Sequence, residues 1–319
     1  MWRSLEKTVR PLQPAGDPAM DITLQAFLAQ LTIGLIGGCF YALLSMGLAI
    51  IFGLLNIINF THGAQFMMAA FLAWIGLTQI GPWLGYPDFQ INFWVALVLA
   101  PLCVALFGMV IERTLLRRLY HLDHLYGLLL TFGVALVMEG AFRYAFGVSG
   151  QGYEPPEILQ GPVDVGFMLL PKYRVFVVVA SLLICFGTWY LFERTKLGAY
   201  LRAGTENPRL LQAFGINVPV MITLTYGFGV ALAGIAGVLA APIMQVTPLM
   251  GGNLLNIVFA VVVIGGLGSI LGAMMTGLAL GLIEGLTKVV YPEASTVVVF
   301  VIMALALLVR PAGLFGREA

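Results

Sequence analysis

The chain has 319 residues, of which 60% are apolar and only 10% are charged. Soluble globular domains carry about 25% charged residues, so this composition excludes a protein that folds on its own in water. The formal net charge of +1 says nothing about partners, whereas the positions of the charges are informative.

The first twenty residues are polar and carry Arg3, Lys7 and Arg10. The apolar run that follows them is too long for the apolar core of a signal peptide and has no clear cleavage site. We therefore expect residues 1–20 to form a cytoplasmic tail and residues 21–319 to form one membrane domain.

Eight apolar runs follow, and a helix that crosses a membrane needs about 20 apolar residues. They cover residues 22–55, 64–80, 91–111, 126–146, 175–192, 218–243, 257–286 and 296–309. The first run is too long for one ordinary helix and is interrupted by glycines, so one option is two short passes. The seventh is also long and has a candidate hinge at Gly265, Gly266 and Gly268. The sequence predicts an all-α, polytopic transmembrane bundle of eight to ten segments.

The orientation follows from Lys and Arg, which are enriched in cytoplasmic loops. The loops after the third and fifth runs and the end of the chain contain Arg113, Arg117, Arg118, Arg194, Lys196, Arg202, Arg209, Arg310 and Arg317. The opposite side has fewer basic residues and several acidic ones. Placing both termini inside requires each glycine-broken stretch to enter and leave the membrane. If either stretch is a single helix, one terminus must lie outside.

Small residues recur every four positions in two of the runs. In lipid the hydrophobic effect does not drive helices together, so close backbone approach along such seams must supply the packing. We interpret these seams as packing faces and not as sites: Gly229, Ala233, Gly237, Ala241, and Ala273, Gly277, Gly281, Gly285. The cysteines Cys39, Cys103 and Cys185 lie in apolar runs without metal-ligand spacing, and we expect no metal site.

The basic loop of residues 193–217 contains a predicted short helix. Asn207 is a good N-cap, and Gly215 is a suitable left-handed stop. Between them one apolar face is predicted from Leu210, Leu211 and Phe214. Such a helix can lie on lipid headgroups, pack beneath its own bundle, or insert into a groove of a partner protein.

This loop resembles the coupling loop of branched-chain amino-acid ABC transporter permeases. The matching positions include Gly198, Arg202, Ala203, Asn207, Ala213 and Gly215. Residues 41–47 and 51–63 resemble the N-terminal signature of the LivH-type permeases, with Thr61 where alanine is more usual. Residues 265–269 and the ending at 310–316 are also similar to that family. The matches run from about residue 24 to residue 316 in the family's order.

The resemblance implies a multi-pass permease subunit of the bacterial inner membrane and several partners. These are a LivM-type permease, two ABC ATPase subunits that dock on the coupling loop, and a periplasmic solute-binding protein that contacts residues 148–174. Membrane lipid and a small solute complete the set, and no nucleic acid is expected. An ATPase needs a GxxxxGK[ST] loop, and this chain has no Gly-Lys pair. We therefore expect the chain to be no enzyme and to bind no cofactor, with ATP and Mg²⁺ used by the partner subunits.

Polar residues inside membrane spans are costly and are candidates for function. Asn56, Asn59 and His62 lie in one segment. They either line the solute path or cap a helix at the membrane surface. Glu139 lies four residues before Arg143 and either faces the central cavity or simply pairs with that arginine.

Two other classes of protein share some of these sequence features. Ser269 and His62 can imitate a serine–histidine pair of an intramembrane enzyme, but no feature of the sequence places them together. A secondary transporter or channel also uses broken helices, but it needs no cytoplasmic docking helix. Within the permease interpretation the solute is a branched-chain or related amino acid, or alternatively urea or a short amide.

Overall fold

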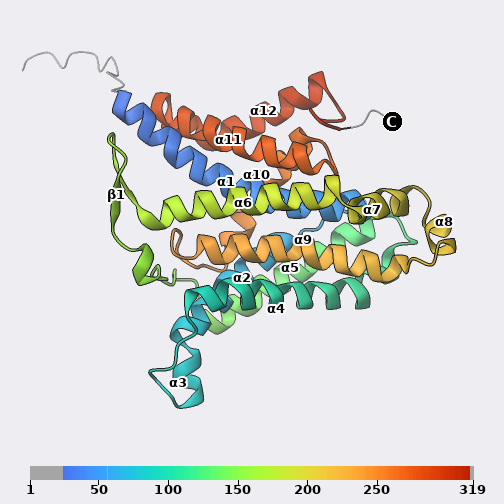
Figure 1. Ribbon diagram of the computed structural model, residues 1–319, viewed down its shortest axis with the longest axis horizontal. Helices are drawn as coiled ribbons and strands as arrows, with labels where there is room; N and C mark the ends of the chain where they lie inside the picture. The colour runs from blue at the N-terminus through green and yellow to red at the C-terminus, as the bar shows by residue number, and fades with distance from the viewer. Residues whose placement is uncertain (1–23, 56, 317–319) are drawn as a thin grey trace, which may run out of the picture.

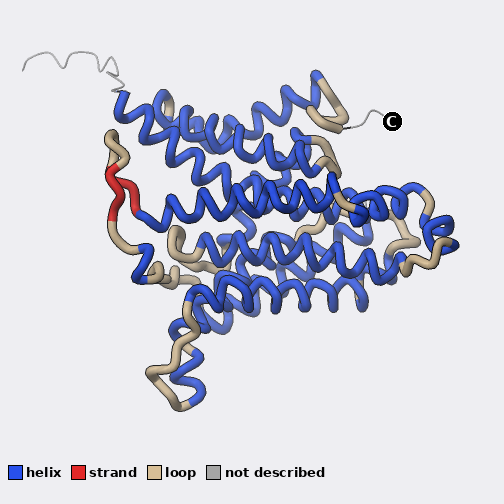
Figure 2. The backbone as a smooth tube through the Cα atoms, viewed as in Figure 1, coloured by secondary structure: helices blue, strands red, loops and turns tan. Residues whose placement is uncertain are grey.

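The computed structural model describes residues 24–55 and 57–316, so the predicted tail of residues 1–20 and Asn56 lie outside the described part. The described part is mostly helical (Figures 1 and 2). Its α-helices are α1 (Leu24–Leu55), α2 (Thr61–Thr78), α3 (Ile80–Leu84), α4 (Phe93–Thr114), α5 (His124–Phe146), α6 (Lys172–Arg194), α7 (Lys196–Glu206), α8 (Pro208–Ala213), α9 (Val218–Ala240), α10 (Met250–Gly265), α11 (Ile270–Val290) and α12 (Ser295–Val309).

Short elements complete the described chain. Three 3₁₀ helices cover Leu116–Leu119, Glu157–Leu159 and Pro292–Ala294. The strands β1 (Pro162–Asp164) and β2 (Leu169–Pro171) form an antiparallel hairpin in which Val163 lies opposite Leu170. A single bridge between Gln151 and Val246 ties the loop before this hairpin to the segment between α9 and α10. The hairpin lies at the end of the bundle opposite α8 (Figure 1).

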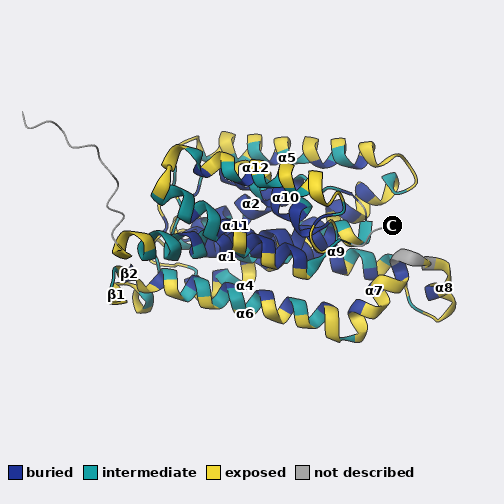
Figure 3. Ribbon diagram, turned by 90° about the horizontal axis from the view of Figure 1, so that it is seen from above, coloured by how far each residue is buried: buried dark blue, intermediate teal, exposed yellow. Residues whose placement is uncertain are grey.

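Seven helices of the described residues are long and apolar enough to cross a membrane: α1, α4 with the 3₁₀ turn that follows it, α5, α6, α9, α11 and α12 with the 3₁₀ turn before it. The shorter apolar α10 and the 18-residue α2 pack among them. The predicted all-α polytopic fold is confirmed. Figure 3 shows α1, α2 and α9 in the buried centre, whereas α5 and α12 lie at the periphery.

Of the two options for residues 22–55, two short passes are excluded and a single helix is found, because α1 is one continuous helix of 32 residues. Its glycines serve packing instead of breaking the helix. A Cβ on Gly34 would lie 2.6 Å from the Gly281 carbonyl oxygen, and one on Gly38 would lie 3.0 Å from that of Leu278, both in α11. Two backbones that approach this closely leave room only for glycine. The packing role of the seam in α11 is thereby confirmed.

The predicted break after Gly265 is confirmed, and it separates α10 from α11. Gly266 and Gly268 have φ angles of +100° and +83°, which favour glycine. Ser269 then caps α11 by accepting a hydrogen bond from the Gly272 N–H at 3.1 Å.

The two ends of the bundle differ in charge. The basic loops after α4 and α6 lie at the same end as the C-terminus, as predicted, and α7 and α8 project from it (Figure 1). Because α1 crosses only once, Leu24 lies at the opposite end, beside the hairpin of β1 and β2. The arrangement with two crossings in this stretch is therefore excluded. By the distribution of Lys and Arg, the end with α8 faces the cytoplasm.

Candidate functional site: the cytoplasmic end and the polar interior

Helix α8 has the capping chemistry that the sequence predicts. The Asn207 side chain accepts a hydrogen bond from the Leu210 N–H at 3.0 Å. Gly215 follows the helix with a φ angle of +82°, in the left-handed region. These two residues confine the helix to six residues at the tip of the cytoplasmic end (Figure 1). The cap and the stop both follow from local rules.

The predicted apolar face of this helix is divided between two directions. Leu211 is buried, whereas Leu210 and Phe214 are 56% and 76% exposed. Leu211 packs inward beside Gly204 of α7, where a Cβ on that glycine would lie 3.3 Å from the leucine side chain. The prediction of one shared face for the three residues is therefore wrong. The outward pair of Leu210 and Phe214 is an exposed apolar patch on a cytoplasmic tip, a feature typical of a protein docking site.

The corner between α6 and α7 fixes the start of the coupling loop. A Cβ on Gly198 would collide with the Phe192 carbonyl oxygen, so the tight corner requires glycine. Arg202 spans the same corner, because its guanidinium donates to the Phe192 carbonyl at 3.2 Å and lies 3.5 Å from a Glu193 carboxylate oxygen. Ala203 and Ala213 are exposed. Two of the predicted coupling residues, at positions 198 and 202, thus fix the orientation of α7.

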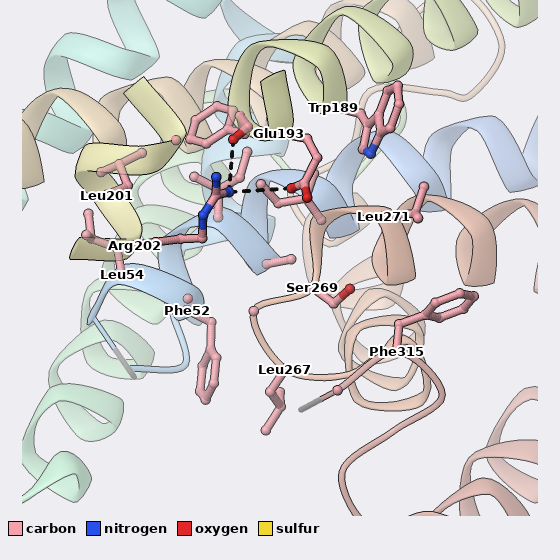
Figure 4. Close-up of a pocket in the computed structure, with 18 of the residues that line it drawn as sticks. Phe52, Leu54, Trp189, Glu193, Leu201, Arg202, Leu267, Ser269, Leu271 and Phe315 are labelled. Carbon is pink, nitrogen blue, oxygen red and sulfur yellow. Dashed lines mark hydrogen bonds and ion pairs between the residues drawn. The ribbon is translucent and has the colours of Figure 1, made fainter. Parts of the chain in front are cut away.

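A cytoplasmic pocket of about 920 Å³ opens beside this corner (Figure 4). Its walls come from the end of α1, the α6–α7 corner, the turn before α11 and the C-terminal segment. Figure 4 shows the Glu193–Arg202 pair on one wall and Ser269 and Phe315 on the other. The predicted coupling residues 198 and 202 and the hinge residue Gly268 therefore border one cavity.

Stretches that are far apart in the sequence meet around this pocket. A Cβ on Gly53 would lie 3.2 Å from the Gly268 Cα, which places the N-terminal signature against the glycine break. The C-terminal segment also docks on the break, since the Leu314 and Phe315 N–H groups donate to the Ile264 and Gly265 carbonyls at 2.8 and 3.1 Å. Residues 49–54 of the N-terminal signature, the coupling loop, the glycine break and the C-terminal ending thus meet at the cytoplasmic end. Motion of the α6–α8 region can reach the glycine break through these contacts.

Of the predicted pathway residues, Asn59 and His62 are 1% and 0% exposed. The side-chain amide oxygen of Asn59 accepts from the Thr61 N–H at 3.2 Å, and the His62 ring lies 3.0 Å from the Leu44 carbonyl oxygen. Asn59 thereby holds the start of α2, but this start is buried against the middle of α1 and does not lie at the membrane surface, as the alternative to a pathway role required. Neither side chain borders the cytoplasmic pocket or a second pocket that lies beside α10.

Glu139 forms an ion pair with Arg143 on α5, with 2.6 Å between the carboxylate and the guanidinium. Because α5 is a peripheral helix and both side chains are partly exposed, this geometry fits the predicted pair of mutually compensating charges. Glu284 is held similarly, since it accepts from Lys288 at 2.7 Å and from the Tyr41 hydroxyl at 2.6 Å. Within the described residues no group of three or more His, Cys, Asp or Glu side chains is placed to hold a metal ion.

Comparisons with known proteins agree with this geometry. A protein-family model described as the branched-chain amino acid transport system permease component matches residues 30–307. The chain belongs to this family. It is similar to the branched-chain amino acid transport permease BraD of Pseudomonas aeruginosa, with 30% identity over 91% of this chain and 96% of BraD. It is 28% identical to LivH of Escherichia coli, over 91% of this chain and 96% of LivH. A third of the chain is 33% identical to the fructose import permease FrcC of Rhizobium meliloti, of which it covers 31%. No solved structure matches the chain.

The permease also contains a buried carboxylate that the sequence analysis did not identify. Glu112 of α4 is 1% exposed and accepts hydrogen bonds from the Tyr120 and Thr223 hydroxyls, both at 2.6 Å. Burial and this carboxylate raise the pKa of the Tyr120 hydroxyl above its ordinary value, so the hydroxyl remains a donor. Glu112 therefore joins α4 to α9 just behind the coupling loop. An acid at the end of an apolar run was the available signal, but Arg113 beside it suggested a solvated loop.

Proposed function

We propose that this permease is the LivH-type subunit of an ABC importer that carries branched-chain amino acids across the bacterial inner membrane. The family membership supports a permease, and the names of BraD and LivH favour a branched-chain amino acid as solute over urea or a short amide. The observation that carries the ATP-driven part is the exposed Leu210–Phe214 patch at the cytoplasmic tip. A secondary transporter or channel has no need of such a patch.

The proposed complex contains a LivM-type permease, two ATP-hydrolysing subunits and a periplasmic binding protein. ATP and Mg²⁺ act in the partner subunits, and this chain performs no covalent chemistry. The binding protein delivers the solute at the end that carries the β1–β2 hairpin. At the other end, α8 inserts the Leu210–Phe214 patch into a groove of an ATPase subunit, as an amphipathic helix does with its apolar anchors.

ATP binding closes the two motor subunits and moves α8. The α6–α7 corner is closely packed at Gly198 and is held by the hydrogen bond of Arg202 to the Phe192 carbonyl. It therefore moves as a unit and displaces the contacts around the cytoplasmic pocket. The glycine break at residues 265–268 is the element that changes its conformation. The bundle then changes from inward-facing to outward-facing, and the solute passes through. This is a two-state change driven by differential binding at one end.

The experiment is uptake into membrane vesicles that contain this permease, its LivM-type partner, the ATPase subunits and the binding protein. Labelled leucine is compared with urea and glutamate. We expect leucine uptake that needs both ATP and the binding protein. Uptake without ATP would contradict the importer and indicate a channel or an ion-coupled carrier, and a preference for urea would contradict the proposed solute.

A charge placed in the docking patch tests the motor contact in the same vesicles. Phe214→Asp should abolish uptake and the co-purification of the ATPase subunits, because a desolvated carboxylate cannot occupy an apolar groove. The matched control is Tyr86→Asp, an aromatic residue that is 72% exposed at the opposite end of the bundle. Equal co-purification of the ATPase subunits with both variants would exclude docking through Phe214.

A further inference from the structure

The exposed face of α10 is chemically unsuited to lipid. Asn253 and Asn256 lie three residues apart on this face of an otherwise apolar helix, and both are exposed. Neither side-chain amide makes a hydrogen bond within the described part of the chain. Amides that face hydrocarbon without partners are costly, so residues of this kind face protein, water or a solute.

A pocket of about 410 Å³ lies directly beside the second of these residues, Asn256. Asn256 is its polar lining residue, and the rest of the lining is apolar, with Phe60, Leu255, Phe259, Phe300 and Met303 among it. This volume and this mixture of an apolar wall with one placed polar group are typical of a small-molecule site. We call this cavity the α10 pocket.

The walls of the α10 pocket come from the buried centre of the bundle, at Leu48 of α1, and from elements at its edge. Phe60 packs edge-to-face on Phe132 of α5, with 5.8 Å between the ring centroids, and the Thr131 hydroxyl donates to the Ile58 carbonyl at 3.2 Å. Phe300 and Met303 belong to α12. Figure 3 shows α5 and α12 on the same side of the molecule, and α10 contacts both α12 and α2, which in turn contacts α5. Because Asn256 and Phe300 are exposed, the pocket borders the outer surface of the bundle.

We propose that the α10 pocket is a transit site for the transported amino acid, whose aliphatic side chain enters the apolar cavity while its polar end meets the amide of Asn256. This inference rests on the proposed function and names the part of the permease that contacts the solute. An asparagine amide donates to a carboxylate through its N–H₂ group and accepts from an ammonium through its oxygen. It therefore serves both ends of a zwitterion.

The absence of a charged group from the α10 pocket lining suits a site that must release its solute. A conducting pathway needs binding that is favourable enough for entry and weak enough for exit. A neutral amide holds a zwitterion less tightly than a desolvated charge does. The site thus selects by the size of the aliphatic side chain more than by charge, and it acts after the binding protein has made its own selection.

The first variant narrows the pocket. Met303→Trp fills part of the cavity, and Leu305→Trp adds the same bulk about 200° further round α12, on an exposed face. Both are reconstituted in the complete transporter with binding protein at saturation, so that delivery does not limit the rate. We expect Met303→Trp to lower the maximal rate for leucine about tenfold while the rate for the smaller alanine falls at most twofold. Leu305→Trp should leave the ratio of the two rates unchanged.

The second variant removes the polar group. Asn256→Leu should reduce uptake of both amino acids about tenfold, and Asn256→Gln should retain most of it. The ATPase subunits and the second permease must still co-purify with the leucine variant. If Asn256→Leu instead dissociates the second permease, the amides serve that interface and the transit site is refuted. An unchanged leucine-to-alanine ratio in Met303→Trp refutes it as well.

These outcomes are separable from failure of the proposed function. If the wild-type complex shows no ATP-dependent uptake of leucine, the importer itself is contradicted before any variant is compared. If the wild type transports leucine but Met303→Trp behaves like Leu305→Trp, only the α10 pocket proposal fails.

Discussion

Among single residues, Gly198 is under the tightest steric constraint in the coupling loop. A Cβ at this position would collide with the Phe192 carbonyl oxygen, so Gly198→Ala must open the α6–α7 corner. We expect a loss of about 1–3 kcal/mol in stability, as in other overpacked sites, and a lower melting temperature of the purified permease in detergent. Gly187→Ala on the open side of α6 is the control and should be neutral or slightly stabilising. Equal melting temperatures for the two variants would contradict the assigned corner.

Glu112 is the second residue for which the structure predicts a clear effect of substitution on stability. Glu112→Leu leaves the Tyr120 hydroxyl without its acceptor and should cost about 1–3 kcal/mol. Glu112→Gln should cost much less, because its amide oxygen can accept from Tyr120 while its N–H₂ group donates to Thr223. The Thr223 hydroxyl then keeps its own bond to the Pro219 carbonyl, now 3.1 Å away. Thermal unfolding in detergent distinguishes the two variants, and a leucine variant as stable as the wild type would refute the role of this carboxylate.

Some features of single residues could be predicted from the sequence, and others could not. Asn207 and Gly215 were predictable because an N-cap and a left-handed stop depend only on neighbouring residues. The orientation of Leu211 was not, because its burial depends on α7 and the bundle behind it. Glu112 escaped prediction for the same reason, since Thr223, one of its two partners, lies 111 residues away in the sequence.

At the scale of elements, the seam between α1 and α11 holds the centre of the permease together. Gly281→Ala places a Cβ against the Gly38 backbone, and the two helices must separate. We expect a fall in melting temperature that corresponds to at least about 1–3 kcal/mol. Gly133→Ala on α5 meets open space and provides the control. A Gly281→Ala variant as stable as that control would mean that the close approach is not needed.

The same seam explains why the sequence left two arrangements open for residues 22–55. A glycine in a membrane helix serves either as a break or as a contact surface, and the sequence of α1 alone does not distinguish them. The two glycines at 266 and 268 differ because they need positive φ angles, and the serine that follows can cap a new helix. The sequence therefore predicted the break in one long stretch but could not decide between a break and a continuous helix in the other.

At the scale of the whole molecule, the continuity of α1 fixes the side on which it begins. We expect Leu24→Cys and Ile158→Cys to react with a membrane-impermeant thiol reagent in intact cells, whereas Gln212→Cys should react only after permeabilisation. Cys103, which is exposed on α4, is replaced by serine to remove the background. Labelling of Leu24→Cys only from the inside would contradict the single crossing of α1 and restore the two-pass arrangement.

The central claim is that this two-ended bundle is driven from its cytoplasmic tip by a separate motor. The most direct test is a photoreactive amino acid at position 214 in vesicles that take up leucine, with the same group at position 86 as the control. The account predicts an ATP-dependent cross-link from position 214 to an ATP-hydrolysing subunit, and none from position 86. Transporting vesicles in which position 214 cross-links only to lipid, or to no subunit, would contradict it.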